Sequence, residues 1–279
     1  MSYTTLVDVE TLQAHLDDPN WLVVDVRHQL SDTGYGEHAY AAGHVPGAVF
    51  LHCDRDLSGA MSGGNGRHPL PDPERLAQRL GDIGIGALTQ VVVYDDAQGM
   101  IAGRLWWLLR WLGHDAVALL DGGLPAWQAA GGTLTSVVPT LLPRAFVTRP
   151  QDLSVNADYV LERLETPHMR LVDARGADRF RGENETIDPV AGHIPGAVNR
   201  CFKDDLLPDG RFKPAARLRA EWLAVLAGSP PDLVVHQCGS GVSACLNMVA
   251  MEVAGLPGSR LYAGSWSEWC ADPGRPVAC

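Results

Sequence analysis

The chain has 279 residues, 46% of them hydrophobic and 20% charged, so it exceeds the usual single-domain size and each half can bury a core. The net charge of −11 argues against nucleic acid or an anionic membrane surface as a partner. No apolar run approaches the ~18 residues of a membrane-spanning helix, so we expect none.

Short runs rich in β-branched residues alternate with segments whose apolar residues have helical spacing. In chain order, the predicted elements of the first half are helix Val7–Asp17, strand 21–26, helix Pro73–Leu80, strand 90–94 and helix Ile101–Leu112. Those of the second half are helix Asn156–Glu165, strand 170–173, helix Pro214–Leu226, strand 232–236, helix Ala244–Ala254 and strand 258–262. This alternation predicts an α/β fold in which each half is a mostly parallel sheet flanked by helices.

The second half repeats the first. The segment Gly-His-Val-Pro-Gly-Ala-Val at 43–49 recurs as Gly-His-Ile-Pro-Gly-Ala-Val at 192–198. The repeat is far longer than that of a solenoid, so each copy is a domain. We predict an N-terminal domain at 1–135, a linker at 136–153 in a proline-containing stretch without periodicity, and a C-terminal domain at 154–279.

Residues present in both halves are expected to be structural. The histidines of the repeated segment, and the acid and arginine that end the preceding strand, belong to this group. They are His44 and His193, Asp25 and Arg27, and Asp173 and Arg175.

Cys238 is the strongest candidate for chemistry. It ends an apolar run and begins Cys-Gly-Ser-Gly-Val-Ser, which a helix-like stretch follows. A glycine-containing loop between strand and helix points backbone N–H groups inward, and the helix adds a partial positive charge. A thiol there ionises easily, although a buried core cysteine is the plain alternative. In the register of the repeat Cys238 falls opposite Asp96, so at this position the second half carries a thiol where the first half carries a carboxylate.

These motifs together resemble the tandem-rhodanese sulfurtransferase family over nearly the whole chain. The resemblance implies two rhodanese domains, of which only the C-terminal one is catalytic. It implies a cysteine nucleophile, Cys238, that takes a sulfane sulfur as a persulfide and passes it to a thiol, thioredoxin or cyanide. No cofactor and no metal are implied. The loop resembles that of the 3-mercaptopyruvate branch, and thiosulfate is the alternative donor.

The loop after Cys238 is expected to hold the persulfide through its backbone N–H groups. Its members are Gly239, Ser240, Gly241, Val242 and Ser243. The glycines let the backbone bend, and Ser240 either donates its hydroxyl to the transferred sulfur or serves the turn. The loop is neutral, which favours mercaptopyruvate over the compact dianion thiosulfate.

A donor carboxylate needs a cation, and the family's Arg-(Phe/Tyr)-x-Gly segment carries that role to Arg179. A second family arginine should follow, but the stretch 183–189 contains none. By resemblance, Ser240, His68 and Asp54 would form a relay. His68 belongs to a glycine-rich stretch at 62–69, which is either a surface loop or a loop that reaches toward the second domain.

Two rival functions remain at this point. A cysteine phosphatase needs Cys-x5-Arg, but that position is Ala244 and the loop has no arginine. A sulfur-carrier module without turnover is the other rival, and turnover with small donors separates it from an enzyme. The cysteines form no CxxC pair and no zinc spacing, and no secretory signal is visible, so we expect free thiols and a cytoplasmic location.

Overall fold

The computed structural model describes residues 2–279, which form two compact units. Unit 1 runs to Gly59 and continues with Pro71–Gln151 and Pro208–Phe212. Unit 2 consists of Ala60–Leu70, Asp152–Leu207 and Lys213–Cys279. The glycine-rich stretch of the first half therefore belongs to unit 2, which supports the second of its two expected roles.

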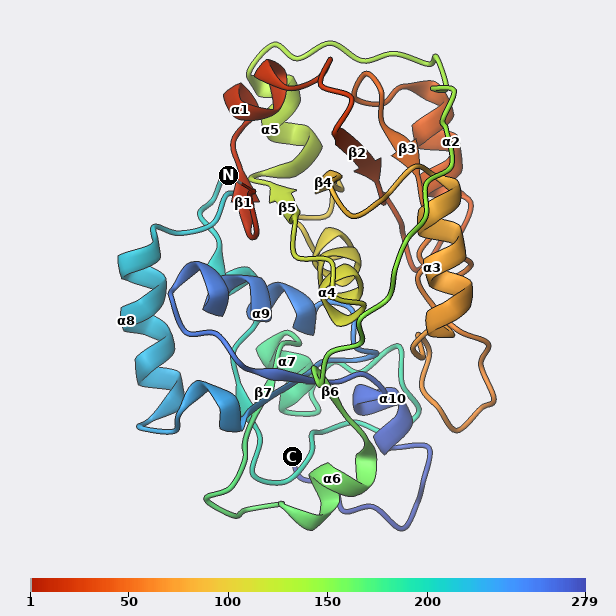
Figure 1. Cartoon of the computed structure of the whole chain (residues 1–279). Coiled ribbons are helices and arrows are strands. Elements are labelled where there is room, and N and C mark those ends of the chain that lie inside the picture. Colours follow the sequence, from red (N-terminus) through yellow and green to blue (C-terminus); the bar gives the residue numbers. More distant parts are fainter. Residues whose placement is uncertain (1) are drawn as a thin grey trace. The chain divides into compact units, whose positions relative to one another are not determined.

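Unit 1 is built on a five-stranded parallel sheet (Figure 1). Its strand order is β1-β5-β4-β2-β3. The strands are β1 Leu6–Val7, β2 Trp21–Asp25, β3 Val49–Phe50, β4 Gln90–Tyr94 and β5 Val117–Leu120. The helices are α1 Val9–Ala14, α2 Tyr35–Ala42, α3 Pro73–Asp82, α4 Ala102–Trp111 and α5 Gly123–Ala129. Every residue of β4 and β5 is buried, as expected for parallel strands covered on both faces.

Unit 2 repeats this architecture strand for strand. Its parallel sheet has the order β6-β10-β9-β7-β8. The strands are β6 Ser154–Val155, β7 Arg170–Asp173, β8 Val198–Asn199, β9 Val234–Gln237 and β10 Arg260–Tyr262. The helices are α6 Ala157–Glu162, α7 Ala177–Phe180, α8 Ala215–Leu226, α9 Ala244–Val253 and α10 Ser265–Trp269, with short 3₁₀ helices η1 Phe202–Asp205 and η2 Pro231–Leu233. The predicted α/β class and the tandem repeat are confirmed.

The sheet register corrects one detail of the sequence alignment. Asp25 pairs with Tyr94 in unit 1, and its counterpart Asp173 pairs with Gln237 in unit 2. The residue that follows Gln237 is Cys238, so its counterpart is Asp95. The expected match of Cys238 with Asp96 is therefore wrong by one position. The reason is that the loop leading to α9 is one residue shorter than the loop leading to α4.

The repeated acid and arginine form a buried pair in each unit. The Nη2 group of Arg27 donates to Asp25 over 2.7 Å and to the carbonyl oxygen of Gly43 over 2.8 Å. The same two bonds, with the same lengths, recur in unit 2 among Asp173, Arg175 and Gly192. The arginines thus tie the end of a central strand to the repeated segment, which agrees with a structural role.

The repeated histidines also bond to backbone. The Nδ1 atom of His44 lies 2.8 Å from the carbonyl oxygen of Tyr40, and the ring stacks on that tyrosine. The Nδ1 atom of His193 lies 2.8 Å from the carbonyl oxygen of Phe180, and the imidazole ring stacks on the ring of Phe180. Because both rings are fixed in this way in both units, a structural role fits them as well.

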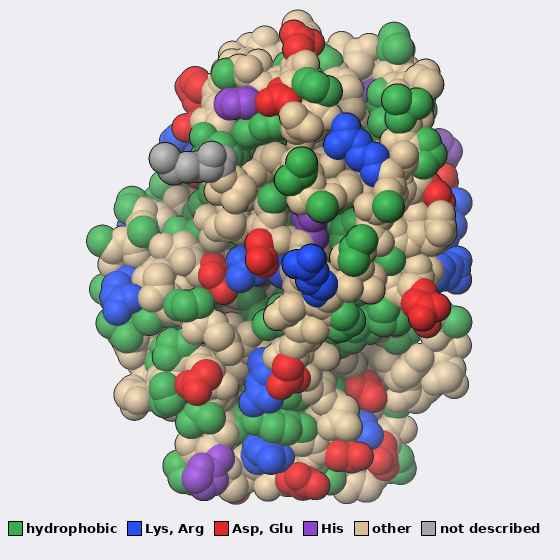
Figure 2. All heavy atoms as spheres, in the orientation of Figure 1, with side chains coloured by type: hydrophobic (Ala, Val, Ile, Leu, Met, Phe, Trp, Pro, Cys, Tyr) green, Lys and Arg blue, Asp and Glu red, His purple; other side chains and the backbone are tan. Residues whose placement is uncertain are grey.

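Two features bear on the expected partners. Acidic and basic side chains are interspersed on the face drawn in Figure 2, so that face carries no broad basic patch for nucleic acid. Within residues 2–279, every helix is too short or too polar to cross a bilayer.

Candidate active site

Cys238 directly follows β9, the central strand of unit 2, at the carboxyl end of the parallel sheet. This edge is where open α/β sheets place their ligands. Only 2% of the surface of Cys238 is exposed. Cys238 is the first residue of a loop that leads to the ten-residue helix α9, which begins at Ala244 and is mostly buried. The thiol therefore lies inside a strand–loop–helix junction, as the sequence predicts.

The backbone of Cys238 is held from both sides by the start of α10. Its N–H donates to the Oγ atom of Ser265 over 3.1 Å, and that hydroxyl donates to the carbonyl oxygen of Tyr262 over 2.9 Å. The carbonyl oxygen of Cys238 accepts the N–H of Trp266 over 3.0 Å. Ser265 is fully buried and was missed at the sequence level. The only signal for it is that the segment 261–266 is similar to the segment 119–124, with Ser265 where unit 1 has Gly123.

Both glycines of the loop have close neighbours, but only at Gly241 does the backbone itself require glycine. A Cβ atom on Gly239 would lie 2.8 Å from the Nη2 atom of Arg67. A Cβ atom on Gly241 would lie 2.3 Å from the carbonyl oxygen of Ala263, and Gly241 has a φ of +74°. The backbone at Gly241 thus approaches the end of β10 more closely than any side chain allows.

In unit 1 the equivalent strand–loop–helix junction binds a carboxylate through its backbone N–H groups. Asp95 occupies the place of Cys238 and is buried. Each of its carboxylate oxygens accepts two backbone N–H groups over 2.8–2.9 Å, from Ala97, Gly99, Ile101 and Ala102. Burial raises the pKa of Asp95, and these four N–H groups oppose that rise. The loop and first helical turn of this fold therefore form an anion-binding cradle.

We expect Asp95→Asn to lower the free energy of unfolding by about 2–4 kcal/mol, because an amide cannot accept four N–H groups and leaves buried donors unpaired. Urea unfolding curves measure this. Asp96→Asn is the matched control, since Asp96 instead accepts the hydroxyl of Tyr35. A larger loss for Asp96→Asn than for Asp95→Asn would contradict the importance of the four N–H groups that bind Asp95.

The structure brings together two of the three predicted relay residues. The Nδ1 atom of His68 lies 2.7 Å from the Oγ atom of Ser240, and both residues are buried within unit 2. They are 172 positions apart in the chain. The third residue, Asp54, belongs to unit 1, where its carboxylate lies 3.8 Å from the Nε2 atom of His28. Its part in a relay stays a prediction.

Arg179 lies in the last turn of α7 and is held by two carboxylates. It pairs with Glu185 over 2.9 Å and with Asp188 over 3.1 Å, and both acids are almost fully buried. These acids lie in the stretch where a second arginine was sought. That stretch therefore fixes Arg179 and adds no cation. Sequence reasoning missed both acids, which only their spacing after Arg179 could have indicated.

Arg67 is a further residue that sequence reasoning missed. It forms an ion pair with Asp188, and its backbone N–H donates to the Oγ atom of Ser267 over 3.1 Å. The pKa of Arg67 is lowered, mainly because its side chain is buried. The nearby Cys238 opposes this shift, and the positive charge of Arg179 adds to it. Arg67 thus lies in the electrostatic environment of the Cys238 loop, contributed by the glycine-rich stretch.

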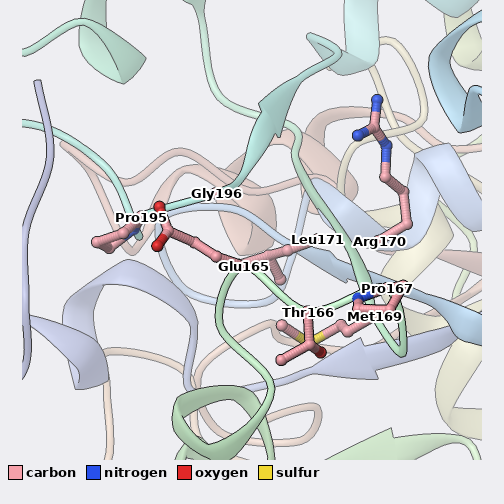
Figure 3. A pocket seen from close by; sticks show the side chains of 8 residues that line it. All are labelled: Glu165, Thr166, Pro167, Met169, Arg170, Leu171, Pro195 and Gly196. Atoms are coloured by element: carbon pink, nitrogen blue, oxygen red, sulfur yellow. The ribbon is translucent and has the colours of Figure 1, made fainter.

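A pocket at the amino-terminal ends of the strands of the same sheet is not part of this site. Figure 3 shows it between Glu165, Met169, Pro195 and the first residue of β7, Arg170. The guanidinium of Arg170 donates to the carbonyl oxygen of Val225 over 2.7 and 3.0 Å, so it is already engaged. Because β7 and β9 are parallel and Cys238 follows the end of β9, the pocket lies a full strand length away.

Comparison with known proteins gives consistent results. The rhodanese-like domain family matches residues 8–130 and 156–272. A Pseudomonas aeruginosa protein named probable 3-mercaptopyruvate sulfurtransferase is 50% identical over 100% of this chain and 99% of its own. Thiosulfate sulfurtransferase of Bos taurus is 34% identical over 93% of this chain and 88% of its own. The crystal structure of SseA from Escherichia coli, described with 3-mercaptopyruvate sulfotransferases, has a TM-score of 0.81 at 30% identity and covers 95% of this chain and 99% of its own.

Proposed function

Since the chain belongs to the rhodanese family of sulfurtransferases, with a matching domain in each half, we propose that it moves the sulfur of 3-mercaptopyruvate through Cys238 to a thiophilic acceptor. The acceptor is a small thiol, a thioredoxin-like protein or cyanide. The observation that carries this proposal is Cys238 at the carboxyl end of β9, in a junction whose counterpart in unit 1 binds a carboxylate.

The proposed reaction has two half-reactions. The Cys238 thiolate attacks the sulfur of the donor, a sulfur–sulfur bond forms, and the carbon–sulfur bond breaks. Its electron pair goes to the carbon, which takes up a proton and leaves as pyruvate. The acceptor thiolate then attacks the outer sulfur and restores the Cys238 thiolate. Ping-pong kinetics follow from this order.

The chain offers a group that can move the required proton. Ser240 and His68 share a hydrogen bond of 2.7 Å, so the hydroxyl can give up a proton to a substrate atom while the imidazole supplies one in turn. The Ser240 hydroxyl lies two residues after the nucleophile in the same loop. We therefore assign the proton transfer to Ser240 and His68.

The outer sulfur of the persulfide is an anion, and we assign its binding to the N–H groups between Gly239 and Ala244. The four N–H groups on Asp95 in unit 1 support this assignment. On the same ground we infer that the N-terminal domain is not catalytic. Its cradle is filled by a carboxylate of its own chain, so no sulfur anion can enter. The chemistry thus belongs to the C-terminal domain together with the loop at 60–70.

Thiosulfate is the second candidate donor, because a relative named thiosulfate sulfurtransferase matches over most of the chain. One structural finding also weakens the argument from the neutral loop. The guanidinium groups of Arg67 and Arg179 come within 2.8 and 3.7 Å of the place of a Cβ atom on Gly239. Cations are therefore close to the sulfur site after all. We keep mercaptopyruvate, the donor named for the 50% identical relative.

We expect kcat/KM to be higher for 3-mercaptopyruvate than for thiosulfate, with the same thiol acceptor. Steady-state rates under anaerobic conditions measure both. Intact mass after donor alone should show one added sulfur atom. Faster turnover of thiosulfate would reverse the choice of donor, and an adduct without turnover would favour the sulfur-carrier module. We propose a reducing compartment such as the cytoplasm, which keeps the six free thiols reduced.

A further inference from the structure

Arg67 is anchored by its backbone beside the segment that holds Cys238. Its N–H donates to Ser267 over 3.1 Å. The preceding Gly66 has a φ of +80°, and a Cβ atom on it would lie 2.7 Å from the carbonyl oxygen of Gly264. The loop is thus packed against residues 264–267, and Ser265 of the same segment binds the N–H of Cys238. The position of Arg67 relative to the nucleophile is therefore fixed by backbone contacts.

The guanidinium of Arg67 has N–H donors that Asp188 does not use. Its Nη1 group pairs with Asp188, and its Nη2 atom is the atom nearest to the place of a Cβ on Gly239, at 2.8 Å. Its Nε group is buried and has no hydrogen-bond acceptor among residues 2–279. A buried N–H without an acceptor is unusual in a folded protein. A bound ligand with acceptor oxygens would satisfy it.

Arg179 lies next to Arg67 because both pair with the same carboxylate. Asp188 binds Arg67 with one oxygen and Arg179 with the other, the latter over 3.1 Å. Both Nη atoms of Arg179 lie 3.7 Å from the place of a Cβ on Gly239. The hydrogen bonds of Arg179 come from its Nε and Nη2 groups, so Nη1 is left for a ligand. Two guanidinium groups thus present donors at the first residue after the nucleophile.

The acids around the two arginines decide what kind of ligand fits. Asp188 and Glu185 balance Arg67 and Arg179 in charge, so the pair supplies directed N–H donors more than net positive charge. A planar carboxylate matches such a set, because it can accept two parallel N–H bonds from the Nε and Nη2 groups of Arg67 and a further one from Nη1 of Arg179. A compact sulfur oxyanion needs net charge more than directed donors.

We propose that Arg67 is a donor-recognition residue, which with Arg179 binds the carboxylate of the sulfur donor beside Cys238. This rests on the proposed function, and it deepens it. The cation that the stretch 183–189 lacks is supplied by the glycine-rich loop, more than a hundred positions earlier in the chain. Asp188 is the positioning residue that holds the two guanidinium groups together.

The test compares two donors that differ only in the carboxylate. These are 3-mercaptopyruvate and mercaptoacetone, in which a methyl group replaces the carboxylate. Arg67→Leu should lower kcat/KM for 3-mercaptopyruvate about 10-fold or more and leave that for mercaptoacetone within about 2-fold. Arg67→Lys keeps the positive charge beside Asp188 but loses the planar guanidinium, so its loss in kcat/KM for 3-mercaptopyruvate should be intermediate. Activity of this variant would also show that a substitution at position 67 does not prevent folding. Arg181→Leu is the control, because Arg181 is exposed and pairs with Glu183.

A binding measurement makes the test independent of turnover. Pyruvate has the carboxylate but no sulfur. Titrated calorimetrically into the Cys238→Ser protein, it should bind about 10-fold more weakly when Arg67→Leu is added. Equal losses with both donors, or unchanged pyruvate affinity, would overturn the role of Arg67 alone. If the unsubstituted protein forms no sulfur adduct with 3-mercaptopyruvate, the proposed function fails and this inference with it.

Discussion

Cys238→Ser should abolish sulfur transfer, with a loss of at least ~10³-fold in kcat, because a hydroxyl neither ionises near neutral pH nor forms a persulfide. The protein should still fold, since the contacts of Cys238 with Ser265 and Trp266 involve only its backbone. Intact mass after incubation with donor, together with steady-state rates, measures the effect. No added sulfur atom should appear.

Cys245→Ser is the matched control for this variant. Cys245 is buried in the first turn of α9, and its Sγ atom lies 3.4 Å from the carbonyl oxygen of Gly241. A serine hydroxyl can donate to the same oxygen, so most of the activity should remain. A persulfide that still forms on the Cys238→Ser protein would show that another cysteine carries the sulfur.

Arg179→Leu should lower kcat/KM for 3-mercaptopyruvate about 30–150-fold, mainly through KM, because it removes a charge-assisted contact worth about 2–3 kcal/mol to the donor carboxylate. Removing Arg179 also leaves Glu185 and Asp188 with fewer partners, although Arg175 lies 3.5 Å from Glu185 and Arg67 pairs with Asp188. Thermal unfolding of the variant should therefore accompany the kinetics.

Arg181→Leu removes an exposed arginine two positions away and should change kcat/KM little. If Arg179→Leu lowered kcat and left KM unchanged, Arg179 would act on the transition state and not in donor binding. If it lowered kcat/KM equally for mercaptoacetone, the contact with the carboxylate would be excluded.

The fold could be predicted because its signals are local. Short apolar runs, helical spacing and glycine-containing loops report on neighbours in sequence, and they gave the longer strands and helices at nearly the observed positions. The short elements have too few residues to show a period and were missed: strands β1, β3, β5, β6 and β8 and helices α2, α5, α7 and α10. The repeat added the prediction of two similar sheets. It failed only in the loop after β4, where a one-residue difference in length moved the counterpart of Cys238 from Asp96 to Asp95.

The nucleophile and its loop were determined by the sequence itself, since the strand, the glycines and the helix around Cys238 are consecutive. Its surroundings were decided only by tertiary structure. Ser240 contacts His68, which lies 172 positions earlier in the glycine-rich stretch at 62–69. Arg67 of the same stretch lies close to Gly239. Such a loop has no hydrophobic pattern to show where it packs. Its place depends on contacts such as Arg67 with Ser267, which form only once the sheet of unit 2 has brought residues 264–267 beside Cys238.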